Sequence, residues 1–130
     1  MTSFEFPNAS NVQFKGLAQK SSLIAIPLLF LGIYHLSHLV FPELYSSIKY
    51  PDSLAIASIA DIFGLVAAFY FFSASKMYTS IVKTQGSDIT LLLIGNEQMK
   101  QALTCLCVTM FLYSARFVAL GFAYKAVLEG

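Results

Sequence analysis

The sequence predicts an all-α integral membrane protein: a bundle of three transmembrane helices with a possible short interfacial helix at the N-terminus. Two observations support this fold class. Of the 130 residues, 57% are hydrophobic and only 12% are charged, whereas about a quarter of the residues in an ordinary soluble domain carry a charge. Three apolar stretches are also long enough to cross a bilayer, which takes about 20 residues. We therefore expect a single transmembrane domain over residues 21–128.

Residues 1–20 precede this domain, and we expect them to form an interfacial helix or a segment bound to a partner. Aromatic and aliphatic side chains are interspersed here with polar residues and with two lysines, Lys15 and Lys20. Such a pattern suits the boundary between water and lipid. The region lacks the apolar core of a cleavable signal peptide, and it contains an acid and no arginine, which fits a mitochondrial presequence poorly.

The first predicted span covers residues 21–45 and carries two histidines, His35 and His38. They are one helical turn apart and therefore lie on one face. These histidines could form hydrogen bonds to a neighbouring helix, transfer protons, or ligate a metal or a haem. A metal would need further ligands, and only Asp61 is available nearby. We expect hydrogen-bonded histidines between helices and no bound metal or cofactor.

The second predicted span, residues 53–78, organises the rest of the chain. Its small residues recur at steps of three and four, which places them on one helical face together with Asp61. Bulky residues cover most of the remaining surface. In lipid, a face of small residues is where another helix packs closely. The residues that we expect in this packing face are Ala57, Ala60, Gly64 and Ala68.

The segment 79–100 is mixed in composition and is expected to be an interfacial helix or a loop. Its apolar run, residues 88–95, is too short to cross a bilayer. This run either opens the next helix or lies at the membrane surface. The following dipeptide, Gly95-Asn96, suggests a second break before the last helix.

The third predicted span, residues 101–128, is about 40 Å long at about 1.5 Å per residue, so it must tilt or protrude from the bilayer. Its deep charge is Arg116, which shares a face with small residues that include Ala119 and Ala123. Two cysteines, Cys105 and Cys107, lie two residues apart, point in different directions and are read as small packing residues.

Four polar side chains are expected at similar depth in one half of the bilayer: His35, His38, Asp61 and Arg116. A lone charge at the centre of a membrane helix costs about 2.5–3.5 kcal/mol on insertion scales. Two opposite charges at matching depth on small-residue faces therefore predict a direct pair between Asp61 and Arg116. Such a pair either fixes helix register or forms part of a site for protons, ions, a substrate or a lipid or quinone headgroup.

The function that the sequence favours is a non-catalytic accessory or assembly subunit of a larger membrane protein complex. No catalytic motif is present, and a net charge of +1 without a basic run gives no indication of a nucleic-acid partner. The expected partners are other integral membrane subunits and the lipid bilayer. One alternative is a membrane anchor that contributes to a haem or quinone site. The other is an oligomeric proton, ion or small-solute transporter that uses the four polar side chains.

The distribution of lysines predicts the orientation. With three spans, one side of the membrane receives five lysines, and the other side receives Lys49 and Lys125. Positive residues concentrate on the cytoplasmic side of membrane proteins. We therefore expect the N-terminus on the cytoplasmic or matrix side of an organelle membrane, either endoplasmic reticulum and endomembranes or the mitochondrial inner membrane.

Overall fold

The computed structural model describes residues 6–41, 51–83 and 88–129, and every regular element in these ranges is an α-helix. The helices are α1 (Asn8–Val40), α2 (Pro51–Lys83) and α3 (Asp88–Glu129). All three are long and apolar enough to cross a membrane. The prediction of an all-helical chain with three such helices is therefore confirmed.

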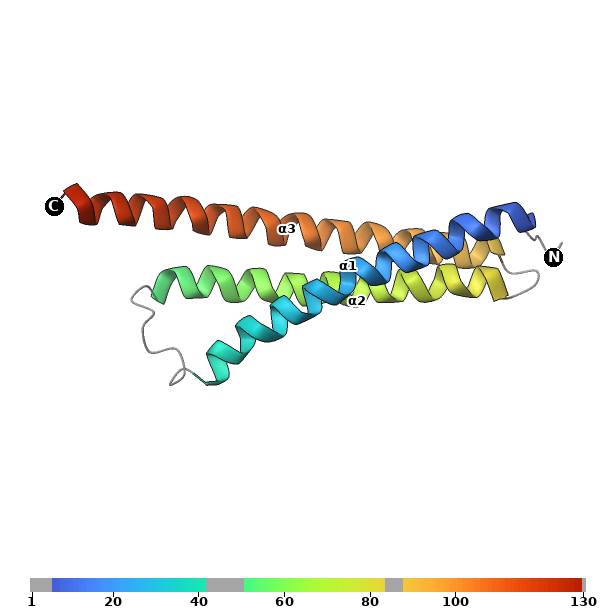
Figure 1. The fold of residues 1–130 in the computed structure, drawn as a ribbon, viewed down its shortest axis with the longest axis horizontal. Coiled ribbons are helices and arrows are strands. Elements are labelled where there is room, and N and C mark those ends of the chain that lie inside the picture. The colour runs from blue at the N-terminus through green and yellow to red at the C-terminus, as the bar shows by residue number, and fades with distance from the viewer. Residues whose placement is uncertain (1–5, 42–50, 84–87, 130) are drawn as a thin grey trace.

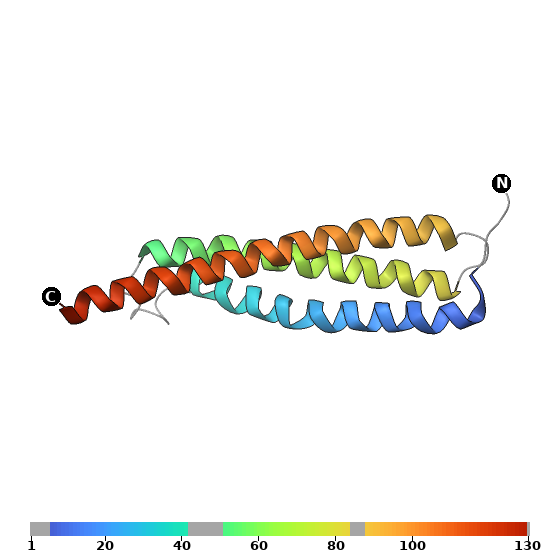
Figure 2. The same cartoon turned by 90° about the horizontal axis from the view of Figure 1, so that it is seen from above.

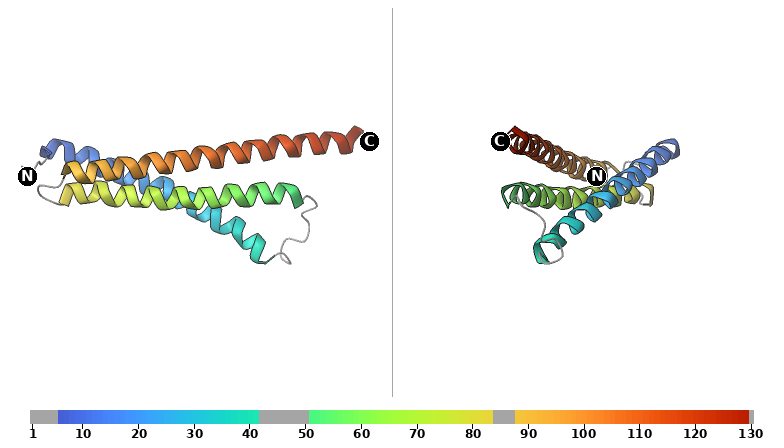
Figure 3. Two further views of the ribbon diagram at one scale, coloured as in Figure 1. Left: turned by 180° about the vertical axis from the view of Figure 1, so that it is seen from behind. Right: turned by 60° about the vertical axis from the view of Figure 1, so that its left-hand side comes forward.

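The middle helix, α2, holds the bundle together (Figure 1). It packs against α1 and against α3, whereas the backbones of α1 and α3 do not come close to each other within the described residues. Figure 2 shows α2 between the other two at the end where α2 finishes and α3 begins. Toward the other end α1 diverges from α2, and the last turns of α3 extend past the first turn of α2 (Figures 1 and 3).

All three helices are longer than the sequence pattern predicts, and α2 takes in residues 79–83 of the segment 79–100. Helix α1 has 33 residues and takes in most of the 1–20 segment, so the described part of that segment is no separate interfacial helix. Pro27 lies inside this helix without ending it. Helix α3 has 42 residues and takes in the second half of the 79–100 segment. Gly95-Asn96 therefore makes no break, and the apolar run before it opens α3.

Two hydrophobic clusters explain these continuous helices. The first, defined by Ala18, Ala74, Tyr78 and Ile81, packs Phe14 of α1 and Leu91 and Leu92 of α3 onto the end of α2. The ends of all three helices thereby bury apolar surface, which outweighs the weak break signal of a single glycine. The second cluster, further along the bundle, is defined by Ala25, Ala68, Phe71 and Ala102.

The predicted small-residue face of α2 is the face that lies between the helices. Ala57, Ala60, Gly64 and Ala68 are all buried. A close approach follows on α1, where a Cβ added to Gly32 would lie 2.5 Å from Cγ of Leu65. On α3 the buried Thr109 packs over Gly64 and donates a hydrogen bond of 3.3 Å to the carbonyl of Ala60. Small side chains thus let both neighbours pack close to α2.

Candidate functional site

Asp61 of α2 is a buried carboxylate, with an exposed fraction of 3%. It lies on the small-residue face of α2, directly after Ala60 and one turn before Gly64, both buried. Because this face lies between α1 and α3, a side chain on it can contact both neighbouring helices. The sequence pattern that buries the alanines therefore also buries the carboxylate.

One carboxylate oxygen of Asp61 contacts side chains of both α1 and α3. The Nδ1 atom of His35, on α1, lies 2.8 Å from Oδ1 of Asp61. The hydroxyl of Tyr113, on α3, donates a hydrogen bond to the same Oδ1. The Tyr113 oxygen and Nδ1 of His35 are themselves 2.8 Å apart. We call these three residues the His–Asp–Tyr cluster, and in it polar side chains from all three helices meet.

Counting the hydrogens available to these three side chains shows which nitrogen of the His35 ring is protonated. The single hydroxyl hydrogen of Tyr113 goes to Asp61, so the Tyr113 oxygen can only accept from His35. Oδ1 of Asp61 already accepts the hydrogen of Tyr113 and brings no hydrogen of its own to His35. Nδ1 of His35 therefore carries a hydrogen, which is shared between the two oxygens. An acid, an imidazole and a phenol joined in this way can pass a proton, and they can equally serve as an interhelical hydrogen-bond network.

The direct ion pair between Asp61 and Arg116 is not formed within the described part of the chain, where Asp61 contacts His35 and Tyr113 instead. The register explains this difference. The residue of α3 that lies level with Asp61 is Tyr113, one turn before Arg116. Nε of Arg116 is shielded from solvent and has no hydrogen-bond partner.

The structure places the other predicted residues as follows. His38 lies in α1, but its side chain lies outside the described ones. On α3, Ala119 is exposed and Ala123 is half-buried. This small-residue stretch of α3 is therefore not packed against another helix of the chain, whereas the small-residue face of α2 is buried. His35 and Asp61 are thus brought together. Arg116 is half-buried and close enough to Tyr113 to interact with it electrostatically, and Ala119 and Ala123 follow it on α3.

Tyr113 is the member of the cluster that the sequence did not single out. It lies four residues after Thr109, which packs on α2, so helical periodicity places both on the same side of α3. A tyrosine in an apolar stretch reads as an ordinary lipid-facing or packing side chain. Its role becomes visible only when α3 is placed beside α2.

No three histidine, cysteine, aspartate or glutamate side chains of the described ranges are grouped closely enough to hold a metal ion. The two cysteines are free, with Cys105 half-buried and Cys107 exposed. The cluster therefore offers hydrogen-bonding and proton-transfer groups and not a ready set of metal ligands.

The chain was also compared with known proteins. No family model matches it, and no curated protein or solved structure shows significant similarity to it.

Proposed function

We propose that the protein is a small integral membrane subunit, an accessory or assembly component of a larger membrane protein complex without catalytic activity of its own. Charge placement supports the membrane location. The stretches 21–40, 54–75 and 101–124 contain Asp61 and Arg116 as their charged residues. At about 1.5 Å per residue these stretches are about 30–36 Å long, close to the hydrocarbon thickness of about 30 Å.

Three lysines frame these stretches at one end of the bundle. Lys20 and Lys76 are level, because Ser75 donates a hydrogen bond of 2.8 Å to the carbonyl of Ala18. Lys100 lies within about one helical turn of them, since Ala102 packs with Ala25 in the second cluster. Lysines at the ends of membrane helices extend their ammonium groups to the surface. We place one membrane surface at this lysine level, with the N-terminus on the same side.

Arg116 is the observation that carries the proposed subunit function. It lies about 24 Å from the lysine level along α3, well inside the proposed membrane. The acid at that depth, Asp61, is occupied by the His–Asp–Tyr cluster, and no described residue forms a hydrogen bond or ion pair with Arg116. An arginine held in lipid without a counter-charge costs about 2.5–3.5 kcal/mol or more. A partner helix with an acidic side chain at this depth would remove that cost.

The surroundings of Arg116 suit such a partner. Ala119 is exposed and Gly121 has open space beside its Cα, so a second helix can approach α3 closely. Phe117 and Phe122, also exposed, border this surface. The small-residue face of α2, in contrast, is already used inside the chain. We therefore propose the C-terminal half of α3 as the docking surface for the larger complex.

The native size of the protein, extracted in mild detergent, tests this proposal. We expect migration with a complex much larger than 14.3 kDa, and mass spectrometry of that band would name the partners. Arg116→Leu should release the protein from the complex, Arg116→Lys should restore part of the association, and Lys125→Gln, which removes an exposed charge from the same helix, should leave it intact. A wild-type protein that runs alone or as a small homo-oligomer would contradict the proposal.

A second function is favoured by the His–Asp–Tyr cluster. The His35 side chain keeps an exposed fraction of 24% while Asp61 is buried, so the imidazole connects the cluster to its surroundings. This arrangement suits proton handling or the binding of a quinone headgroup within an oligomer. Proton flux or solute flux in liposomes that disappears with Asp61→Asn would support this function, and a Soret band in the purified protein would indicate haem. Equal flux in wild type and Asp61→Asn would exclude a role for the cluster in transport.

A further inference from the structure

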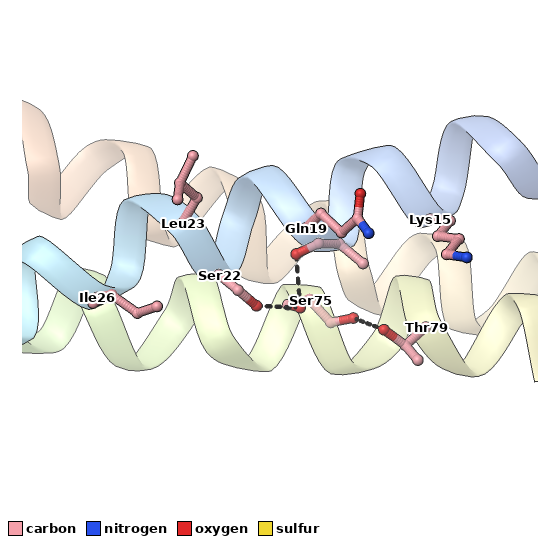
Figure 4. A pocket seen from close by; sticks show the side chains of 8 residues that line it. Lys15, Gln19, Ser22, Leu23, Ile26, Ser75 and Thr79 are labelled. Carbon is pink, nitrogen blue, oxygen red and sulfur yellow. Dashed lines mark hydrogen bonds between the residues drawn. The ribbon is translucent and has the colours of Figure 1, made fainter.

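An open groove with a volume of about 430 Å³ lies between α1 and α2, away from the His–Asp–Tyr cluster (Figure 4). Its polar end carries Lys15, Gln19 and Thr79, and its apolar end carries Leu23 and Ile26. The groove runs parallel to α1, because its α1 residues Lys15, Gln19, Leu23 and Ile26 lie one after another along that helix. The groove therefore changes from polar to apolar along the axis of the bundle.

This change occurs at the proposed membrane surface. The level of Lys20 and Lys76 crosses the groove in its middle. Lys15 lies about 7 Å from Lys20 on the aqueous side, and Ile26 lies about 9 Å from it on the lipid side. A molecule that fills the groove would thus have its polar part at headgroup depth and its apolar part among the acyl chains.

The floor of the groove is a closed set of hydrogen bonds (Figure 4). Ser75 donates to the carbonyl of Ala18, so the Ser22 hydroxyl must donate to Ser75 Oγ, at 2.8 Å. Thr79 donates to the carbonyl of Ser75, also at 2.8 Å. These hydroxyl groups keep only acceptor lone pairs for a ligand. The donors at the polar end are the Lys15 ammonium and the Gln19 amide.

We infer that this groove binds a glycerophospholipid with an anionic headgroup. The phosphate lies at Lys15 and Gln19, whose donors suit an anion. Headgroup hydroxyls donate to the oxygen of Thr79, which lies at the polar end with Lys15, and one acyl chain lies along Leu23 and Ile26. A phosphoglycerol headgroup supplies both the phosphate anion and the hydroxyl donors, so phosphatidylglycerol is the probe of choice. The inference shares the membrane location of the proposed function but not its docking surface on α3.

Native mass spectrometry of the full chain in mild detergent tests this inference. With phosphatidylglycerol added, we expect one retained lipid per chain, and weaker retention of phosphatidylcholine. Lys15→Gln should lower the affinity roughly fivefold, as expected for one basic side chain at an anionic lipid. Lys20→Gln is the matched control, since Lys20 is an exposed lysine of the same helix outside the groove, and it should bind like wild type. Equal losses in the two variants would show attraction by surface charge only and would overturn the inference.

A second pair of variants tests the acyl-chain half. Ile26→Trp should fill the apolar end and reduce lipid retention, whereas Phe30→Trp, at an exposed position of α1 outside the groove, should not. Glycerophosphoglycerol, which has the headgroup without chains, should compete poorly. Strong competition by this compound or by inorganic phosphate, with Ile26→Trp unaffected, would show a simple anion site and overturn the inference. Arg116→Leu should bind lipid like wild type, so failure of the subunit proposal and failure of the lipid site are distinguishable.

Discussion

The carboxylate of Asp61 is held by donors from two different helices, so one residue fixes the positions of three elements. His35 and Tyr113 approach the same oxygen from α1 and α3. A buried carboxylate without such donors would be strongly unfavourable, and a buried donor without its acceptor costs about 1–3 kcal/mol. These contacts form only when α1 and α3 are in one axial position relative to α2. The cluster therefore stabilises that register in preference to registers shifted by a turn.

Asp61→Ala should lower the free energy of unfolding by about 1–3 kcal/mol, because it leaves the imidazole N–H and the phenol hydroxyl without an acceptor. Tyr113→Phe removes one donor and should cost about 1 kcal/mol. Tyr124→Phe, at an exposed position of the same helix, is the matched control and should change nothing measurable. Thermal unfolding in mild detergent measures all three variants.

Double variants separate the cluster from the ion pair that the sequence predicts. Asp61→Ala combined with Tyr113→Phe should cost less than the sum of the single changes, since both remove the same hydrogen bond. Asp61→Ala combined with Arg116→Ala should give additive losses, because Asp61 contacts His35 and Tyr113 instead. A larger coupling of Asp61 to Arg116 than to Tyr113 would contradict the arrangement in the structure.

At the scale of the elements, close packing of α1 on α2 depends on glycine at one position. A Cβ added to Gly32 would meet Cγ and Cδ2 of Leu65 at 2.5 and 2.6 Å, while one added to Gly16 would meet nothing within 4 Å. Glycine in a helix interior costs about 1 kcal/mol relative to alanine. The two glycines of α1 therefore differ only in what surrounds them.

Gly16→Ala should raise the free energy of unfolding by up to about 1 kcal/mol through helix propensity alone. Gly32→Ala should instead lower it by about 1–3 kcal/mol, the usual cost of overpacking, because Leu65 must move and α1 must shift away from α2. Thermal unfolding of the two variants compares them directly. A stabilised Gly32→Ala protein would show that α1 and α2 are further apart than described.

The continuity of α3 depends on packing at Met99, which contacts both hydrophobic clusters. Met99→Ala should cost about 1–2 kcal/mol, somewhat below the range for fully buried methionines, because Met99 is half-buried. Met110→Ala, on the same helix with an exposed fraction of 62%, should have little effect. Hydrogen exchange should show faster amide exchange over residues 88–99 in Met99→Ala alone, and equal exchange in both variants would argue against this anchor.

At the scale of the whole molecule, α2 is the only helix that packs along both others within the described ranges. The C-terminal half of α3 is left with large exposed side chains, which include Phe117, Phe122 and Leu128. Lipid can cover the aromatic and aliphatic groups, but it does not neutralise Arg116. This combination is the reason for our proposal of a partner in the membrane.

A membrane location predicts how the free cysteines react. Cys107 is exposed on the surface of the chain, yet it lies about 10 Å inside the lysine level. A membrane-impermeant maleimide should therefore leave it unmodified in sealed vesicles and modify it after solubilisation in denaturing detergent. Cysteines introduced by Gln13→Cys and Ala126→Cys, in a background without Cys105 and Cys107, should react from opposite sides of the vesicle. Rapid labelling of Cys107 in intact vesicles would contradict the bilayer placement.

The sequence predicts the helical class, the three apolar helices and the face of α2 that carries Asp61. These features depend on composition and on helical periodicity within a single segment, which the order of residues determines directly. Helix ends were harder to predict. The strength of a break signal such as Gly95-Asn96 depends on what the flanking turns bury, and Leu91, Leu92 and Met99 find their partners on the other two helices.

The sequence by itself determined that Asp61 lies on a small-residue face and that His35 and Arg116 lie within apolar helices. Only the tertiary structure decided which of them meet. A shift of α3 by one turn against α2 exchanges Arg116 for Tyr113 opposite the carboxylate. Such a shift changes little in the periodic pattern of either helix, because small residues recur every turn. The contacts of the whole bundle fix it, and they place Tyr113 rather than Arg116 in contact with Asp61.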